Sequence, residues 1–84
     1  MDIYVGNLDF KVNESDLEEI FREYGTVSSA KIITDKFTGR SKGFGFVTMD
    51  DQDEAAKAIK GLDGATLSTR EITVNEAKPK KSQY

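Results

Sequence analysis

One stretch decides the fold of this 84-residue chain: Lys42-Gly43-Phe44-Gly45-Phe46-Val47-Thr48-Met49. Successive side chains of a β-strand point to opposite faces of a sheet, so residues two apart share a face. Val47 and Met49 then lie on one face, while Phe44 and Phe46 lie on the other. The stretch therefore predicts a strand over residues 42–49 with an aliphatic face and an aromatic face.

Three further segments show strand character, and two show helical character. Residues 3–5 form a short Ile-Tyr-Val run, residues 27–34 precede a turn-rich loop at 35–41, and residues 71–75 alternate near the end of the chain. Between these strands, two apolar stripes repeat at helical spacing. The stripes are Leu17, Ile20, Phe21 and Tyr24 in the first, and Ala55, Ala58, Ile59 and Leu62 in the second.

Polar residues mark the predicted helix ends. Asn13 is an N-cap candidate with Asp16 at the third helical position, and Gly25 occupies the position expected for a C-terminal glycine. Asp51, with Glu54 three residues later, predicts the start of the second helix with a capping-box-like pattern.

The order strand, helix, strand, strand, helix, strand predicts a two-layer α+β sandwich, because two helices cover only one face of a four-stranded sheet. By alternation, the covered face carries an aliphatic set: Ile3, Val5, Ala30, Ile32, Val47, Met49, Ile72 and Val74. The open face then carries Tyr4, Lys31, Ile33, Lys42, Phe44, Phe46, Thr48, Thr73 and Asn75. Three aromatic rings thus lie where no helix covers them.

Exposed rings need an explanation, because apolar area left in water costs about 25 cal/mol per Å². A one-residue register slip would bury the phenylalanines, but it would also turn Val47 and Met49 outward and Lys42 inward. Alternatively, the tail or a partner protein covers the face. In a third interpretation, unpaired nucleobases stack on the rings at about 1–3 kcal/mol each, and the lysines meet phosphates.

Composition excludes several function classes. The chain has no histidine, cysteine or tryptophan, so zinc fingers, disulfide frameworks and Ser-His or Cys-His catalysis lack their essential residues. No stretch reaches the roughly 18 apolar residues of a membrane span, and the first residues do not resemble a signal peptide. We expect a protein of a reducing compartment: the cytoplasm, or the nucleus if the source is a eukaryote.

The charge is unevenly distributed. The formal net charge of −3 taken alone argues against a polyanionic partner. However, residues 13–24 carry five acidic side chains against one arginine, whereas residues 31–49 carry four basic side chains against one aspartate. Three lysines follow in residues 78–81. The small net charge therefore combines an acidic segment at residues 13–24 with basic segments at residues 31–49 and 78–81.

The octamer at residues 42–49 resembles the ribonucleoprotein octamer of the RNA-recognition motif, and Ile3-Tyr4-Val5-Gly6-Asn7-Leu8 resembles the hexamer of that family. The resemblance covers residues 2–78 and is to small single-motif bacterial proteins and to the motif of plant glycine-rich RNA-binding proteins. It implies a ferredoxin-like βαββαβ sandwich with a four-stranded antiparallel sheet. We expect one domain over residues 1–77 and a short, flexible basic tail over 78–84.

The resemblance also implies roles for individual residues. Tyr4 and Phe44 would stack under two neighbouring bases, Phe46 would pack against the sugars between them, and Lys42 would pair with a phosphate. The other candidate RNA-binding residues are Asn7, Lys31, Ile33, Arg40, Thr73, Asn75 and Lys78. Lys31 and Ile33 either contact the RNA or form a solvated edge of the sheet. The loop bearing Lys36, Phe37 and Arg40 either folds over the bound RNA or is mobile.

Two positions depart from the family pattern. Met49 stands where the octamer usually ends in an aromatic residue, and in Leu67-Ser68-Thr69-Arg70 no glycine precedes the arginine. By the alternation along the strand, Gly43 and Gly45 occupy positions on the face that the helices cover. Because they have no side chain, we expect them to let the helices approach the sheet closely.

The sequence therefore predicts a noncatalytic, monomeric module that binds single-stranded RNA, and single-stranded DNA more weakly, without cofactor, metal or membrane. The expected role is post-transcriptional regulation or RNA chaperoning. The alternative is a protein-interaction module on the same fold. An acylphosphatase-like enzyme is disfavoured, because the loop after the first strand offers Asp9 where an anion-binding loop is needed.

Overall fold

The computed structural model describes residues 1–77. In chain order the elements are β1 (Asp2–Gly6), α1 (Glu14–Arg22), β2 (Ser29–Thr34), β3 (Ser41–Thr48), α2 (Gln52–Leu62), β4 (Thr66–Leu67), β5 (Arg70–Glu71) and β6 (Thr73–Glu76). The tail predicted for residues 78–84 lies outside the described residues.

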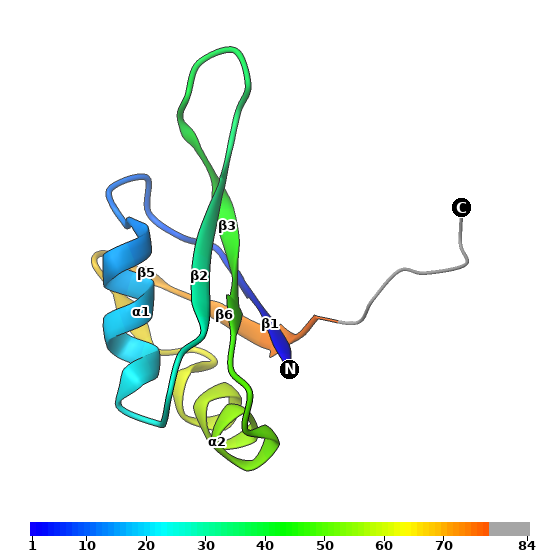
Figure 1. The fold of residues 1–84 in the computed structure, drawn as a ribbon. Helices are drawn as coiled ribbons and strands as arrows, with labels where there is room; N and C mark the ends of the chain where they lie inside the picture. Colours follow the sequence, from blue (N-terminus) through cyan, green and yellow to red (C-terminus); the bar gives the residue numbers. More distant parts are fainter. Residues whose placement is uncertain (78–84) are drawn as a thin grey trace.

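The main sheet has the strand order β2-β3-β1-β6, with every neighbouring pair antiparallel. Both helices lie on one face of this sheet, and no described element covers the opposite face (Figure 1). The predicted two-layer, ferredoxin-like class is confirmed. We call the uncovered side, carried by β2, β3, β1 and β6, the open face.

The core lies between the sheet and the helices. The strands bury Ile3, Val5, Val47 and Val74, and the helices bury Leu17, Phe21, Ala55, Ala58 and Leu62. Met49, directly after β3, and Ile72, directly before β6, are also buried. Ala30 and Ile32 of the edge strand β2 pack against this core but are only partly buried. Leu8 and Val12, which precede α1, are buried as well, and strand and helix periodicity alone did not identify them.

The start of α1 is as predicted, but its end is not. The Asp16 N–H donates to Asn13 Oδ1 at 2.9 Å, and the Asn13 N–H donates to Asp16 Oδ2 at 3.1 Å, which completes a capping box. The C-cap is Glu23, so Gly25 lies one position beyond the expected one and has no positive φ. A Cβ at Gly25 would instead collide with the side chain of Glu54. Glycine there leaves room for this carboxylate.

The Glu54 carboxylate also explains why the start of α2 differs from the predicted capping box. Asp51 is the N-cap, and its side chain accepts hydrogen bonds from the N–H groups of Asp53 and Glu54. Glu54 Oε1 accepts from the Thr26 N–H at 3.1 Å and does not return to the cap. The helix start is therefore correct, but the reciprocal half of a capping box is absent.

The expectation that Gly43 and Gly45 let the helices approach is wrong. A Cβ at residue 45 would press against the carbonyl oxygen of Lys31, in the backbone of β2, and would lie 3.2 Å from the Ile32 Cα. Gly43 has φ of +88°, and its nearest neighbour would be the Leu8 carbonyl oxygen at 3.6 Å. The two glycines therefore permit close strand pairing and an unusual backbone turn.

The last predicted strand is divided. β5 and β6 replace the single strand expected over residues 71–75, and β5 pairs with β4 in a small hairpin. Ser68 in the turn has φ of +62°. Asp9 Oδ2 accepts from the Thr69 hydroxyl at 2.7 Å and from the Ser68 hydroxyl at 3.3 Å, which ties the hairpin to the segment after β1.

Hydrogen bonds also set the protonation of Asp9. Its Oδ1 accepts from the Lys11 N–H at 3.0 Å. This bond, followed by the bond from the Thr69 hydroxyl, holds the pKa of Asp9 below its ordinary value, because both bonds favour the charged carboxylate. Within residues 1–77, no helix has the length and apolar character to cross a membrane.

Candidate nucleic-acid interface

The strand register brings residues from all four strands into one row on the open face. Phe46 lies opposite both Lys31 and Tyr4, and Tyr4 lies opposite Asn75. Directly paired residues of antiparallel strands have their side chains on the same face. The row therefore runs Lys31, Phe46, Tyr4, Asn75 across the sheet, with two rings in the middle and a cation at one end.

A second row lies beside the first. Gly6 pairs with Phe44 on one side and with Thr73 on the other. These residues are two positions from Tyr4, Phe46 and Asn75, so they share the open face. Two adjacent rows of the sheet thus hold all three rings and both β6 side chains that the sequence predicted for the site.

The three rings form one cluster. Ring centroids of Tyr4 lie 5.9 Å from those of both Phe44 and Phe46, and the two phenylalanine centroids are 6.2 Å apart. The planes of Tyr4 and Phe44 are inclined by only 32°, whereas Phe46 is edge-on to Phe44 at 90°. Edge contacts stabilise aromatic pairs. Tyr4 and Phe44 are thus two similarly inclined rings, and Phe46 lies beside both of them at a steeper angle.

The register interpretation that buries the rings is wrong. Val47 and Met49 are fully buried, and Tyr4, Phe44 and Phe46 are only half-buried. Half-burial is what side chains on an uncovered sheet show when they pack against one another. The tail that the second interpretation places over this face lies outside the described residues.

Lys42 and Ile33 lie at an irregular point of the sheet. Ile32 pairs with Gly45 and Thr34 with Ser41, so residues 42–44 stand opposite Ile33 alone. Such a bulge breaks strict alternation and redirects side chains. Ile33 is half-buried and Lys42 is exposed, and the Lys42 charge is close enough to Asp35 to act on its pKa.

The loop between β2 and β3 has a defined turn. Asp35 Oδ1 accepts from the N–H groups of Phe37 at 2.7 Å and Thr38 at 3.2 Å, and these bonds are the main reason that the pKa of Asp35 is lowered. The Asp35 N–H donates to the carbonyl oxygen of Arg40 at 2.8 Å. The loop is therefore closed by hydrogen bonds at its base, and Arg40 is exposed there.

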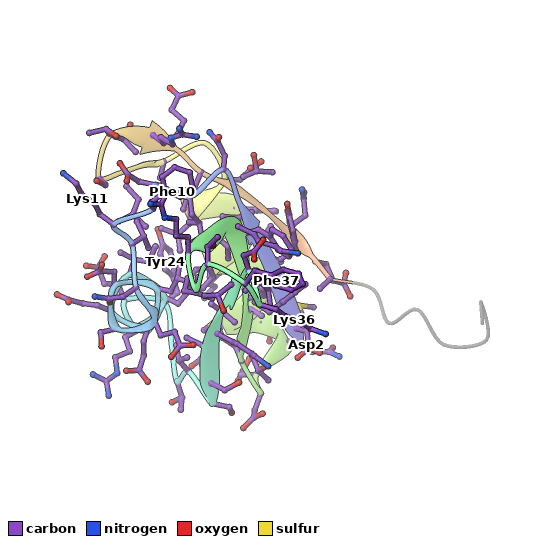
Figure 2. The ribbon with its side chains drawn as sticks, turned by 90° about the horizontal axis from the view of Figure 1, so that it is seen from above. Asp2, Phe10, Lys11, Tyr24, Lys36 and Phe37 are labelled. Atoms are coloured by element: carbon purple, nitrogen blue, oxygen red, sulfur yellow. The ribbon has the colours of Figure 1, made fainter. Side chains whose placement is uncertain are left out.

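The same loop presents an exposed aromatic residue. Phe37 is 96% exposed and Phe10, after β1, is 69% exposed. Figure 2 shows Lys36 and Phe37 on the side of the sheet away from α1, whereas Phe10 and Lys11 lie on the α1 side. Only the first pair is on the side of the ring cluster.

The side chain of Asn7 is engaged within the protein. Asn7 has φ of +58°, its Nδ2 donates to the Glu71 carbonyl oxygen at 2.6 Å, and its Oδ1 accepts from Arg70 at 3.4 Å. It therefore joins the end of β1 to β5. Lys78, the last predicted site residue, lies outside the described residues.

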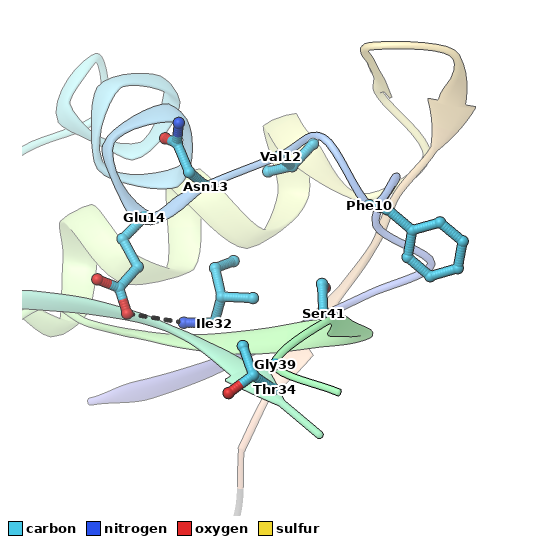
Figure 3. Close-up of a pocket in the computed structure, with 8 residues that line it drawn as sticks. All are labelled: Phe10, Val12, Asn13, Glu14, Ile32, Thr34, Gly39 and Ser41. Atoms are coloured by element: carbon cyan, nitrogen blue, oxygen red, sulfur yellow. Dashed lines mark hydrogen bonds between the residues drawn. The ribbon is translucent and has the colours of Figure 1, made fainter. Parts of the chain in front are cut away.

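A separate groove of about 290 Å³ lies on the helix side (Figure 3). Its lining is Phe10, Val12, Asn13, Glu14, Ile32, Thr34, Gly39 and Ser41, which includes none of the predicted site residues. Glu14 Oε2 accepts from the Ile32 N–H at 3.2 Å beside it. This carboxylate makes the groove unsuitable for a phosphate and satisfies a donor on the free edge of β2.

Gly6 and Asp2 also lie on the open face, and they were not singled out as site residues from the sequence. Gly6 lies beneath the ring of Tyr4, whose hydroxyl oxygen would be 2.5 Å from a Cβ at that position. Asp2 pairs with Thr48. Both are two positions from Tyr4, so alternation along β1 was the signal that places them on the open face. Within residues 1–77, no group of His, Cys, Asp or Glu side chains has the arrangement of a metal site.

Comparisons with known proteins agree with this geometry. Residues 3–73 match the family described as the RNA recognition motif. RbpA of Synechocystis is 47% identical over 99% of this chain and 82% of its own length. The RNA-binding protein CP29B of Arabidopsis thaliana chloroplasts is 51% identical over 98% of this chain, which spans 29% of that longer relative.

Solved structures show the same fold. The crystal structure of RNA binding protein PG1 has a TM-score of 0.90 and 48% identity, and it covers 95% of this chain and 99% of its own. The protein of a Sxl-lethal protein/RNA complex has a TM-score of 0.89 and 28% identity over 96% of this chain and 48% of its own. The chain belongs to the RNA recognition motif family.

Proposed function

We propose that this protein binds single-stranded RNA on its open face by stacking bases on Tyr4 and Phe44. The observation that carries the proposal is the cluster of three half-buried rings on an uncovered sheet, with Lys31 in the same row. Base–aromatic stacking contributes about 1–3 kcal/mol per base. The similar inclination of the Tyr4 and Phe44 rings suits two successive bases, and CP29B and PG1 are named as RNA-binding proteins.

The other side chains divide by chemistry. Phe46, whose ring plane is steeply inclined to those of both stacking rings, packs against sugars, and Lys31, Lys42 and Arg40 contact phosphates. Thr73 and Asn75 on the β6 side hydrogen-bond base edges, because both groups donate and accept. Ile33 extends the apolar floor and Lys78 adds a phosphate contact. Asn7 acts by positioning β5, since its amide is already hydrogen-bonded.

The expected affinity is modest. A few stacks at about 1–3 kcal/mol each, reduced by the ordering of a flexible strand, correspond to a dissociation constant of roughly micromolar size. Single-stranded DNA binds more weakly where the 2′-hydroxyl is contacted. The unit that binds is a monomer whose single domain is residues 1–77.

The biological role follows from these properties. The protein acts as a binding module and not as an enzyme, in post-transcriptional regulation or RNA chaperoning. Its place is the cytoplasm, or the nucleus if the source is a eukaryote. Relatives come from Synechocystis and from plant chloroplasts, so a chloroplast is a further setting for a plant protein of this kind.

The test compares two phenylalanine variants by fluorescence anisotropy with short RNA homopolymers. Phe44→Ala should lose more than about tenfold in affinity, since it removes one stacking ring, and should keep the native circular dichroism spectrum. Phe10→Ala removes an equally large exposed ring on the helix side and should bind RNA as the wild type does. Equal affinity of Phe44→Ala and the wild type would refute the stacking proposal.

A further inference from the structure

A third row on the open face carries a carboxylate. Thr48 lies opposite both Ser29 and Asp2, and each is two residues from the ring-bearing row, at about 3.3 Å per residue along the strand. Ser29, Thr48 and Asp2 have short side chains. The row is therefore a shallow part of the open face, two residues along the strands from Phe46 and Tyr4.

Asp2 is held firmly in this row. The Thr48 hydroxyl donates to Asp2 Oδ1 at 2.8 Å, and the Ala77 N–H donates to the Asp2 carbonyl oxygen at 2.9 Å. The residue is thus fixed from β3 on one side and from the end of β6 on the other. It is nevertheless exposed, and Figure 2 shows it on the side of the sheet away from α1. Oδ2 makes no hydrogen bond within residues 1–77.

A fixed, exposed carboxylate has a narrow choice of RNA groups. It only accepts hydrogen bonds and it repels phosphates. The base edges that suit it present N–H donors, such as the amino group of cytosine or adenine. Guanine suits it best, because the adjacent N1–H and N2–H groups can meet one carboxylate together. Uracil offers a single N–H between two carbonyl oxygens, which the carboxylate repels.

We propose that Asp2 is a specificity-determining residue that selects guanine, and disfavours uracil, at the nucleotide lying over the Ser29–Thr48–Asp2 row. This inference rests on the proposed RNA binding and adds a base preference to it. Thr48 acts as the positioning residue, because its hydroxyl fixes one carboxylate oxygen. The charge also keeps phosphates away from this row and so favours a base there.

The test measures binding of the intact protein to hexauridine and to six hexamers that each carry one guanosine. One position of guanosine should raise affinity about tenfold over hexauridine. Inosine lacks the N2 amino group but has the same charge, so replacing that guanosine by inosine should lose most of the gain. In Asp2→Asn the guanosine-to-inosine ratio should fall to about 1. A ratio unchanged from the wild type would overturn the inference.

Controls separate this effect from general electrostatics and from folding. Glu19→Gln removes one exposed negative charge from α1 and should leave the guanosine-to-inosine ratio as in the wild type. Thr48→Val keeps the carboxylate but frees it, and should lower the ratio only partly. If the wild-type protein binds the hexamers without base preference, the proposed role of Asp2 is refuted but the proposed RNA binding is not. Failure to bind any hexamer would refute the proposed function itself.

Discussion

The ring of Tyr4 lies over the backbone of Gly6, so closely that a Cβ at residue 6 would be 2.8 Å from Cε2 and 2.9 Å from Cζ. Gly6 has no positive φ, so its backbone does not require glycine. The residue is small because the ring needs the space. One glycine on β1 thus sets the position of the tyrosine that we propose as a stacking platform.

Gly6→Ala should therefore weaken RNA binding without removing an aromatic ring. The added methyl group displaces the flexible end of Tyr4, so we expect a several-fold loss, bounded by the roughly 1–3 kcal/mol of one stack. Isothermal titration with a short RNA measures it. In Tyr4→Ala the same glycine substitution should have no further effect, and additive losses would contradict this explanation.

Gly61 supplies a matched control for this variant. A Cβ at Gly61 would collide with Tyr24, on the helix side of the molecule. Gly61→Ala therefore also displaces a tyrosine ring, but one away from the open face. Its RNA affinity should equal that of the wild type.

Gly45→Ala should damage the sheet itself. The new Cβ would press against the backbone of β2 at Lys31, which cannot swing away as a side chain can, and such overpacking costs about 1–3 kcal/mol. Hydrogen exchange should show loss of amide protection concentrated in β2. Gly64→Ala, with φ of +84° and no atom near its Cβ, should lower the free energy of unfolding without singling out β2.

Thr69→Val should raise the pKa of Asp9. The Lys11 N–H and then the Thr69 hydroxyl lower this pKa below 3.8 in the folded protein. Removing the hydroxyl should move the pKa upward, though not fully to 3.8, because the bond from Lys11 remains. An NMR titration of the Asp9 carboxyl group measures the change. An unaltered pKa in Thr69→Val would show that the hairpin contact does not act on Asp9.

The same shift has a consequence for stability against pH. Asp9 and Asp35 both have lowered pKa values in the folded state. Their stabilising contribution is complete above the unfolded value near 3.8 and is lost as pH falls through the lower folded values. The free energy of unfolding should therefore decrease below about pH 4, and less so in Asp9→Asn, measured by urea denaturation.

Salt should weaken RNA binding in proportion to the number of phosphate contacts. With about three or four contacts, log K should fall against log salt concentration with a slope of about −2 to −3. Lys31→Gln should reduce the magnitude of the slope by about 0.7, because Lys31 shares a row with Phe46. Lys11→Gln, on the helix side, should leave the slope unchanged, and an equal effect of both variants would argue against a localised interface.

Most of the fold could be predicted from the sequence, because strand alternation and helix capping depend on residues close together along the chain. Alternation placed Tyr4, Phe44 and Phe46 on one face, and the Asn13 cap is a contact between residues three apart. The β4–β5 hairpin was not predicted, because its strands have two residues each and its anchor, Asp9, is 60 residues from Thr69. The positions of Lys42 and Ile33 could not be obtained by alternation, since the bulge interrupts it.

By itself, the sequence determined the order of the two helices and the four strands of the main sheet, the face that carries the rings and most members of the core, since periodicity depends only on spacing along the chain. Only the tertiary structure decided the angles between the ring planes and the close approach of the β2 backbone to Gly45. It also decided that the Thr48 hydroxyl donates a hydrogen bond to Asp2, 46 residues away in the sequence. These features depend on the register between strands. Register is set by many long-range contacts at once, and no short stretch of sequence contains it.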